Sequence, residues 1–262
     1  MDFSQIFYNL ERIATIERGC MKIVPMDKTF VLYRCLHAGL LSPSNIELKS
    51  ANVPGLLKDQ IERNNIFLSR LIDAYGSCAM LAVEGEYVVG YARFYPGFVY
   101  RRAGRKHICC QDQQSPITSD MVEMEMPKSE NLNDRTLRIN CWFIHGDYRN
   151  RGLSHLFLQS ILEWAHQNGW ATVRAPAAVN NFWVASQACT LMLRTYEKHG
   201  FRKISTSSAA KLRDYLTQVQ QGQFGTARQQ EFERHCREED LSEIAVYHTV
   251  ECALDKEAEL PQ

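Results

Sequence analysis

The sequence predicts a mixed α/β (α+β) fold, in which helices flank a mixed β-sheet, on three observations. Residues 78–100 alternate in polarity and are rich in Val and Tyr, as in a β-hairpin. An apolar run at residues 137–144 leads through a basic glycine turn into an amphipathic stretch at residues 153–167. Further short strand and helix patterns follow. Hairpin strands followed by strand–helix units imply a mixed sheet with helices on its faces.

Length and composition limit the classes of protein that fit. The chain has 262 residues, enough for one large α/β domain or two small ones. Its 45% hydrophobic and 23% charged residues are ordinary globular usage, which argues against disorder throughout. Thirty Lys and Arg balance thirty Asp and Glu, so no overall field attracts nucleic acid or an anionic membrane, and we expect neither as a partner.

The first twenty residues predict a helix and not a targeting segment, because apolar residues recur at helical spacing among interspersed charges. No stretch reaches the roughly 20 apolar residues that a membrane-spanning helix needs. The nine cysteines are scattered and odd in number, which is typical of reduced thiols. The sequence thus predicts a cytoplasmic protein with an N-terminal helix at 1–20 and one domain at 21–262.

Before the hairpin, the pattern predicts one strand and two helices. The strand is expected at Met21–Val24. Asp27 is expected to cap a helix that continues through Tyr33 and His37, and a longer helix is expected at Pro54–Ala74.

The hairpin turns at Glu84-Gly85-Glu86, a glycine-containing pattern typical of tight connections. Residues 101–135 are polar and contain Gly and Pro, which predicts an irregular insertion with one strand at Ile108–Cys110. Residues 207–240 predict a second, helical insertion. The remaining elements are expected in this order: strand Leu137–Ile144, helix Leu153–Gln167, strand Ala171–Ala175, helix Val184–His199, strand Phe201–Ser205, helical segments Lys211–Gln221 and Thr226–Glu239, and strand Ile244–Leu254.

The turn between the strand at 137–144 and the helix at 153–167 has the features of an anion site. The first turn of a helix has four backbone N–H groups without intrahelical partners and carries partial positive charge. A diphosphate satisfies both at once. The residues of this turn are Arg149, Asn150, Arg151, Gly152, Leu153 and Ser154.

Three motifs resemble the GNAT superfamily of N-acyltransferases, which use acetyl-CoA or another acyl-CoA. The turn at 149–154 is similar to the family's R/Q-x-x-G-x-G/A pyrophosphate loop, with Ser154 where Gly or Ala is usual. Tyr196-Glu197-Lys198-His199-Gly200-Phe201 looks like the Y-E-K-x-G-F signature, and EGEYVVGYARF looks like the strand pair ahead of the cofactor strand. The order and spacing of the three motifs match the family.

The resemblance implies a GNAT-like, centrally splayed sheet with the two insertions, and it implies site residues. Backbone groups of Trp142, Phe143 and Ile144 would bond the pantetheine amides as a pseudo-strand. Tyr196 aligns with the position that serves as general acid, and a phenol with a pKa of about 10 can protonate a thiolate leaving group.

The sequence does not identify the residue that acts as general base. The strand at 137–144 contains no carboxylate, and the nearest candidates by sequence are Asn140, His145, Glu123 and Glu125, with a water chain as an equal alternative. Cys189 stands where relatives commonly carry an Asn that contacts the cofactor.

Two other patterns suggest cysteine chemistry. His107, Cys109 and Cys110 form an H-x-C-C cluster, but adjacent cysteines without a further C-x-x-C rarely make a zinc site, so we expect no metal. A Cys–His nucleophile pair is conceivable there or between Cys141 and His145, and a thiol-dependent enzyme centred on Cys109 or Cys110 is the third and weakest functional hypothesis.

The leading hypothesis is an N-acyltransferase that moves an acetyl or other acyl group from acyl-CoA to a primary amine by direct attack. A small-molecule amine, amino acid or peptide is as plausible an acceptor as a protein lysine, because no large charged field is evident. The alternative is a catalytically silent acyl-CoA-binding protein whose insertions form a partner-interaction surface.

Overall fold

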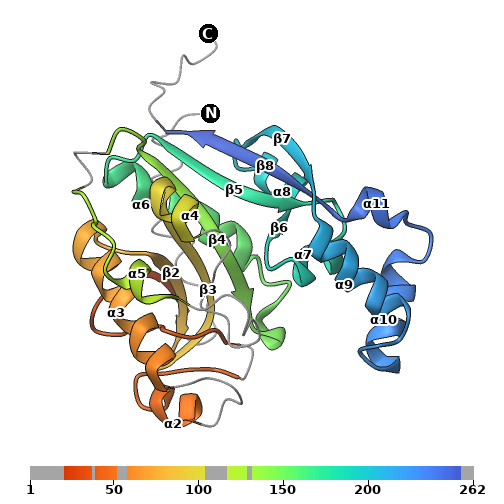
Figure 1. Ribbon diagram of the computed structural model, residues 1–262, viewed down its shortest axis with the longest axis horizontal. Helices are drawn as coiled ribbons and strands as arrows, with labels where there is room; N and C mark the ends of the chain where they lie inside the picture. The colour runs from red at the N-terminus through yellow and green to blue at the C-terminus, as the bar shows by residue number, and fades with distance from the viewer. Residues whose placement is uncertain (1–20, 37–38, 52–57, 104–116, 129–131, 255–262) are drawn as a thin grey trace. The chain divides into compact units, whose positions relative to one another are not determined.

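The computed structural model describes residues 21–36, 39–51, 58–103, 117–128 and 132–254 (Figure 1). The helix expected at 1–20 and the strand expected at Ile108–Cys110 lie outside these ranges. The chain divides into two compact units, Met1–Thr172 with Leu254–Gln262, and Val173–Ala253.

The first unit contains four antiparallel strands that pair in chain order. They are β1 (Lys22–Pro25), β2 (Ala79–Glu84), β3 (Tyr87–Pro96) and β4 (Thr136–Ile144). Gly85 has φ +60° at the turn between β2 and β3, a conformation that glycine adopts without strain. The hairpin expected from alternating polarity is therefore confirmed.

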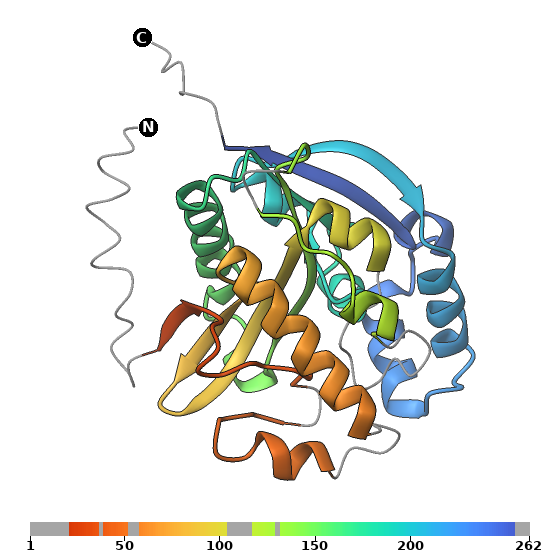
Figure 2. The same ribbon diagram turned by 60° about the vertical axis from the view of Figure 1, so that its left-hand side comes forward.

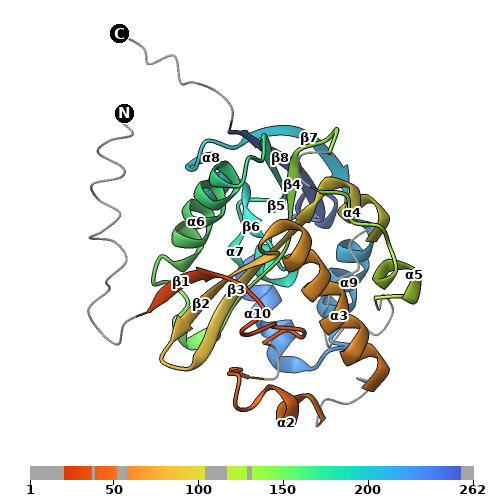
Figure 3. The same ribbon diagram turned by 90° about the vertical axis from the view of Figure 1, so that its left-hand side faces the viewer.

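Helices cover both faces of this antiparallel sheet. On one face lies α6 (Leu153–Gln167), whose Trp164 ring is 4.9 Å from Phe94 of β3. On the other lies α3 (Lys58–Tyr75), whose Phe67 meets Tyr95 of β3 edge-on at 5.8 Å. Figure 2 shows α3 in orange across the yellow strands, and Figure 3 shows α6 and α3 on opposite sides of them.

Two expectations for the first unit are wrong. No helix continues through the described residues 26–36, because the Asp27 side chain accepts the backbone N–H of Thr29 at 2.8 Å and closes a local turn instead of capping a helix. The insertion at 101–135 is not wholly irregular, since α4 (Gly97–Ala103) and α5 (Ser119–Val122) lie in or next to it. A further short helix, α2 (Ile46–Ala51), precedes α3.

The second unit combines parallel and antiparallel strand pairs. Its strands β5 (Thr172–Ala178), β8 (Val246–Ala253) and β7 (Arg202–Ser208) lie side by side in that order, and the short β6 (Leu191–Met192) pairs in parallel with β5. Strands β7 and β8 are antiparallel. The predicted mixed class is confirmed, while a central splay between β4 and β5 stays a prediction because these strands belong to different units.

The helix expected at Val184–His199 is wrong as one element. It is split into α7 (Phe182–Gln187), strand β6 and α8 (Leu193–Glu197). The break falls at Cys189, which has φ +49°, a left-handed conformation that ends an α-helix. The Thr190 hydroxyl then donates to the carbonyl oxygen of Pro176 in β5, which fixes the chain after the break beside that strand.

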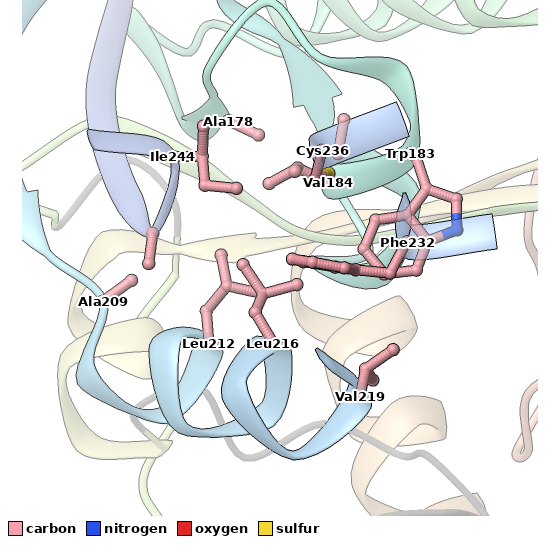
Figure 4. Packing of buried hydrophobic residues seen from close by; sticks show 12 residues of the cluster. Ala178, Trp183, Val184, Ala209, Leu212, Leu216, Val219, Phe232, Cys236 and Ile244 are labelled. Carbon is pink, nitrogen blue, oxygen red and sulfur yellow. The ribbon is translucent and has the colours of Figure 1, made fainter. Parts of the chain in front are cut away.

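The helical insertion of the second unit builds an apolar cluster of its own. It contains α9 (Ala210–Gln220), α10 (Thr226–Cys236) and α11 (Leu241–Ile244), close to the helical segments expected there. Figure 4 shows Leu212 and Leu216 of α9 turned towards Trp183 of α7 and Phe232 of α10. The Trp183 and Phe232 rings meet edge-on at 5.7 Å.

Among the helices of the described ranges, none is both long and apolar enough to cross a membrane.

Candidate functional site

At the end of β4, the backbone groups of two residues point away from β3. Gly90 of β3 lies opposite Ile144, and the backbone N–H of His145 donates to Val89 at 2.9 Å. Antiparallel ladders alternate, so from this bond the backbone groups of Phe143 face β3 and those of Trp142 and Ile144 face the opposite edge. This edge is where the sequence predicts pantetheine contacts.

The side chains at this end of β4 anchor it on both faces of the sheet. Trp142 is buried and meets Phe157 of α6 edge-on at 5.9 Å. Phe143 stacks on Tyr91 of β3 with ring centroids 6.0 Å apart. The backbone edge formed by Trp142 and Ile144 is thus held rigidly from two sides, which suits a binding strand.

A β-bulge interrupts β4 upstream of this edge. Arg93 lies opposite Cys141, but Phe94 lies opposite Ile139, so Asn140 is the extra residue. A bulge re-aims the side chains next to it. Cys141 Sγ is 3.6 Å from the Tyr91 hydroxyl, and Asn140 lies near enough to the Tyr95 hydroxyl to influence its pKa, so both point to the face covered by α3.

The turn after β4 changes direction through two left-handed residues. A short 3₁₀ turn, η2 (Gly146–Tyr148), is followed by Asn150 with φ +61° and Gly152 with φ +77°. Asn tolerates this region better than other side chains, and Gly has no penalty there. The chain then enters α6 at the buried Leu153, so the exposed residues 149–152 lie at the first turn of that helix.

The first turn of α6 leaves backbone donors available. Gly152 caps the helix without a side-chain bond, and no acidic residue lies in the first turn. His155 and Leu156 both donate to the Gly152 carbonyl, at 3.0 and 3.3 Å. Within the part of the chain that the structure describes, the N–H groups of Leu153 and Ser154 have no acceptor. A bound anion satisfies such donors and also matches the positive end of the helix dipole.

The two arginines of the turn are held by neighbours that leave their charges available. Arg149 donates through Nε to the carbonyl oxygen of Ile144 at 3.2 Å. The Arg151 guanidinium lies 4.9 Å from the centre of the Tyr148 ring. Neither belongs to an ion pair with any described carboxylate. The guanidinium groups are therefore placed beside the helix start with their charges uncompensated.

Tyr148 is itself fixed by an acidic partner on β2. Its hydroxyl donates to Glu84 Oε2 at 2.5 Å, and this bond raises the pKa of Tyr148. Tyr148 thus stays a neutral phenol, whose ring face attracts the Arg151 cation. Together Glu84 and Tyr148 position Arg151, a support that the sequence motif does not reveal.

Tyr196 lies in the second unit, on α8, and is fully buried. Its ring meets Phe201 at 5.1 Å, and its hydroxyl is 3.5 Å from Thr190 Oγ1. Since the Thr190 hydroxyl donates its own proton to the carbonyl oxygen of Pro176, its oxygen can accept a hydrogen bond from the Tyr196 hydroxyl. The helix break at Cys189 thereby supplies a polar partner to the phenol. The turn at 149–154 belongs to the first unit, and Tyr196 belongs to the second.

The candidate bases occupy different surroundings in the first unit. Glu123 and Glu125 are exposed, whereas Asn140 is buried in the bulge. His145 is half-buried, with Nδ1 at 3.5 Å from Asp147 Oδ2. His145 lies directly between β4 and the anion turn, which makes it the titratable candidate nearest to both.

The described residues contain no group of side chains arranged as a metal site, and Cys141 is placed as a core residue. His107, Cys109 and Cys110 lie outside the described ranges. Elsewhere in the described part, no three His, Cys, Asp or Glu side chains are grouped to hold a metal ion. Cys141 is buried against Tyr91 and behaves as a small core residue.

Sequence reasoning missed a set of buried polar residues in the first unit. Arg34 and Arg93 are 1% and 0% exposed. Arg93 lies within an alternating strand whose residues Val88–Pro96 are all buried, so its position alone did not mark it as interior. The signal available in the sequence was a charged residue within an otherwise apolar and aromatic strand.

Comparisons with known proteins give structural likeness only. No family model and no curated protein matches the chain. The chain is similar to an acetyltransferase of the GNAT family from Streptococcus pneumoniae, at 12% identity and a TM-score of 0.45, over 89% of this chain and 99% of that one. It is similar to a GNAT family acetyltransferase from Elizabethkingia anophelis with acetyl-CoA bound, at 14% identity and a TM-score of 0.40, over 89% and 98%.

A third similar structure is an N-acetyltransferase from Staphylococcus aureus, at 12% identity and a TM-score of 0.44, over 89% of this chain and 98% of that one. At such identities and TM-scores, an assignment of function depends on the residues and geometry of this chain.

Proposed function

We propose that this chain is an acyl-CoA-dependent N-acyltransferase of the GNAT superfamily. The observation that carries the proposal is the start of α6, where Leu153 and Ser154 offer backbone donors next to the uncompensated charges of Arg149 and Arg151. A helix start with these features, directly after a strand whose Trp142 and Ile144 backbone groups point away from β3, fits a pyrophosphate followed by a pantetheine chain.

The proposed roles follow from these positions. Residues 149–154 bind the pyrophosphate, and the backbone of Trp142 and Ile144 bonds the pantetheine amides. Acyl-CoA supplies an acyl group activated as a thioester, which an amine attacks directly. Acetyl-CoA is the donor we favour, and the cytoplasm is the compartment we expect.

Proton transfers in this reaction need one donor and one acceptor. The amine nitrogen forms the new C–N bond as the C–S bond breaks, the Tyr196 hydroxyl gives a proton to the sulfur, and a base removes one from the nitrogen. Thr190, which is 3.5 Å from the Tyr196 hydroxyl, orients that hydroxyl. We assign the base to His145, directly or through water, because β4 carries no carboxylate.

Cofactor binding is tested by the thermal shift of the full chain with acetyl-CoA. A ligand at 100 times its dissociation constant stabilises by about 2.7 kcal/mol. We expect the double variant Arg149→Ala, Arg151→Ala to lose this shift. The matched control Arg101→Ala, Arg102→Ala removes two exposed charges from α4 and should keep it. An unchanged shift in the first variant would contradict the assignment of the turn.

Turnover is tested by release of free thiol from acetyl-CoA with a panel of amines. We expect Tyr196→Phe to lower the rate while leaving the acetyl-CoA shift intact. Tyr215→Phe, which removes another hydrogen-bonded phenol of the second unit, is the control.

The alternative, a silent acyl-CoA-binding protein, is favoured by one observation: Cys189 stands at the helix break, where relatives carry a cofactor-binding Asn. Tight binding of acetyl-CoA without thiol release from any amine in the panel would establish it.

A further inference from the structure

Arg34 is a buried cation whose terminal nitrogens have no acceptor in the described structure. It lies in the segment after β1 and is 1% exposed. Its Nε donates to the carbonyl oxygen of Cys35 at 3.3 Å, but neither Nη1 nor Nη2 makes a hydrogen bond to a described residue. The guanidinium group of an arginine carries a full positive charge. An unpaired buried charge is costly, which is a reason to expect a ligand.

Arg93 fixes the segment that carries Arg34 against the sheet. Its Nη2 donates to the carbonyl oxygens of Leu32 and Arg34, at 2.7 and 2.8 Å. Its guanidinium also lies 4.5 Å from the centre of the Tyr91 ring. The backbone at Arg34 thus lies on the face of β3 from which Arg93 and Tyr95 project, which is the face that α3 covers.

Neutral polar groups with unused hydrogen-bonding capacity lie on this same face. Neither amide atom of Asn140 in the bulge makes a hydrogen bond of ordinary geometry, and nor does the Tyr95 hydroxyl, although Asn140 lies close enough to lower the pKa of Tyr95. Asn64 on α3 donates to the Tyr33 carbonyl at 3.3 Å, while its Oδ1 has no donor. Arg93 donates to the carbonyl oxygen of Arg34, and Asn64 donates to that of Tyr33, the residue before Arg34. Phe67, which lies on α3 with Asn64, packs against Tyr95.

Buried water alone does not account for a buried guanidinium together with these neutral polar groups. It can satisfy an amide or a hydroxyl, but it does not neutralise a guanidinium in a low-dielectric interior. A carboxylate does so, because its two oxygens match the two terminal nitrogens of an arginine. The amide oxygens of Asn64 and Asn140 can accept N–H groups, so a ligand with both a carboxylate and an amine uses the whole set.

We infer that Arg34, Asn64, Tyr95 and Asn140 form a binding site for the carboxylate and amine of an amino acid. In terms of the proposed function, on which this part rests, the acceptor amine belongs to a molecule that carries a carboxylate. The guanidinium of Arg34 binds the carboxylate, and the amides of Asn140 and Asn64 bind the amine end.

The first experiment compares amino acids with their carboxamides on the full chain without CoA. L-alanine, L-phenylalanine, L-glutamine and L-lysine are each paired with the corresponding amide, and binding is measured by thermal shift and calorimetry. We expect at least one acid to bind about tenfold to a hundredfold more tightly than its amide, the ratio that hydrogen bonds to a charged group provide. Equal responses to every acid and amide would overturn the proposal. So would an equal shift with inorganic phosphate, which would indicate a general anion site.

Variants connect the binding to Arg34. We expect Arg34→Gln to lose the preference for the acid, and to unfold at the same or a higher temperature than the wild type without ligand. The matched control is Arg63→Gln on α3, which also loses a guanidinium bond to a carbonyl oxygen, that of Ile117, and should keep the preference. A folded Arg34→Gln protein with an undiminished preference would contradict the assignment. If this variant does not fold, the wild-type comparison of acids with amides decides alone.

Thiol release separates this inference from the proposed function. If acids bind but acetyl-CoA neither binds nor releases thiol, the transferase proposal fails and the amino-acid site stands. If thiol is released equally fast with amines that have and lack a carboxylate, the transferase stands and the Arg34 site fails.

Discussion

The two units bury different kinds of residue, and the contrast separates stability from recognition. In the second unit, the cluster around Leu216 and Phe232 is apolar, and the Trp183 Nε1 is near Glu231 at 3.4 Å. In the first unit, the face between β3, β4 and α3 contains two arginines and an asparagine whose amide has no hydrogen bond. An apolar interior stabilises the fold by itself, whereas a polar interior with unused donors costs stability and suits a ligand.

The largest effect is expected where the interior is apolar. Phe232→Ala removes a ring that is 2% exposed and packed against Trp183, so unfolding in urea should show a loss of about 3–5 kcal/mol. Phe224→Ala, at a ring that is 50% exposed, is the control and should cost far less. Equal losses in the two variants would show that the cluster is not the stabilising core of its unit.

On the face between β3, β4 and α3 of the first unit, we expect removal of one buried arginine to leave the stability of the protein unchanged or to raise it. Arg34→Met exchanges a buried charge without a hydrogen-bonded terminal nitrogen for an apolar side chain of similar length, so the ligand-free protein should keep its stability or gain up to about 2 kcal/mol. Arg93→Met removes bonds to two carbonyl oxygens and should cost about 1–3 kcal/mol. Urea titrations of both variants check the difference. A large loss in Arg34→Met would make Arg34 a structural residue.

The sequence revealed the exposed parts of the site better than the buried ones. Helix α6 begins at Leu153 and ends at Gln167 as expected, because a glycine cap and an apolar stripe are local signals. The break at Cys189 was not predictable from apolar spacing, since it depends on a left-handed residue and on a bond from Thr190 to β5.

The polar face was hidden for a related reason. Alternation in a strand predicts one polar face in water, but β3 is covered by α3 on one side and α6 on the other. Alternation alone therefore does not predict that Arg93 is buried. The bulge at Asn140 depends on the register with β3 and leaves no local pattern.

Two asparagines, one in each unit, allow the same comparison between a hydrogen-bonded and an unpaired polar side chain, with smaller expected changes in stability. Asn181 caps α7 by accepting the Val184 N–H at 3.1 Å and donates to the His235 carbonyl at 2.9 Å. Asn181→Ala should cost about 1–2 kcal/mol. Asn140→Ala should cost less without ligand, because the Asn140 amide makes no hydrogen bond to a described residue. Denaturant titrations of the two variants test this order, and a greater loss in Asn140→Ala would show that its amide stabilises the bulge.

The smallest effect is a pH dependence within the apolar cluster of the second unit. Burial raises the pKa of the Cys236 thiol to about 11, whereas an exposed thiol has a pKa of about 8.5. Between these values the unfolded chain loses the thiol proton and the folded chain keeps it. Stability associated with this group is therefore complete below about pH 8.5 and falls as the pH rises towards 11.

Denaturant titrations between pH 8 and 11, compared with Cys236→Ala, isolate this contribution, because the variant lacks the thiol but keeps the other titrating groups. The wild type should lose more stability than the variant across this pH interval. Thiolate absorbance of the folded wild type should appear at a higher pH than that of the wild type unfolded in urea. Parallel curves would mean that Cys236 ionises as freely in the folded chain as in the unfolded one, and that the apolar cluster is open to water on the side of α10. Such an outcome would weaken the contrast between the two interiors, because the apolar cluster of the second unit would then admit water to a group that can carry charge.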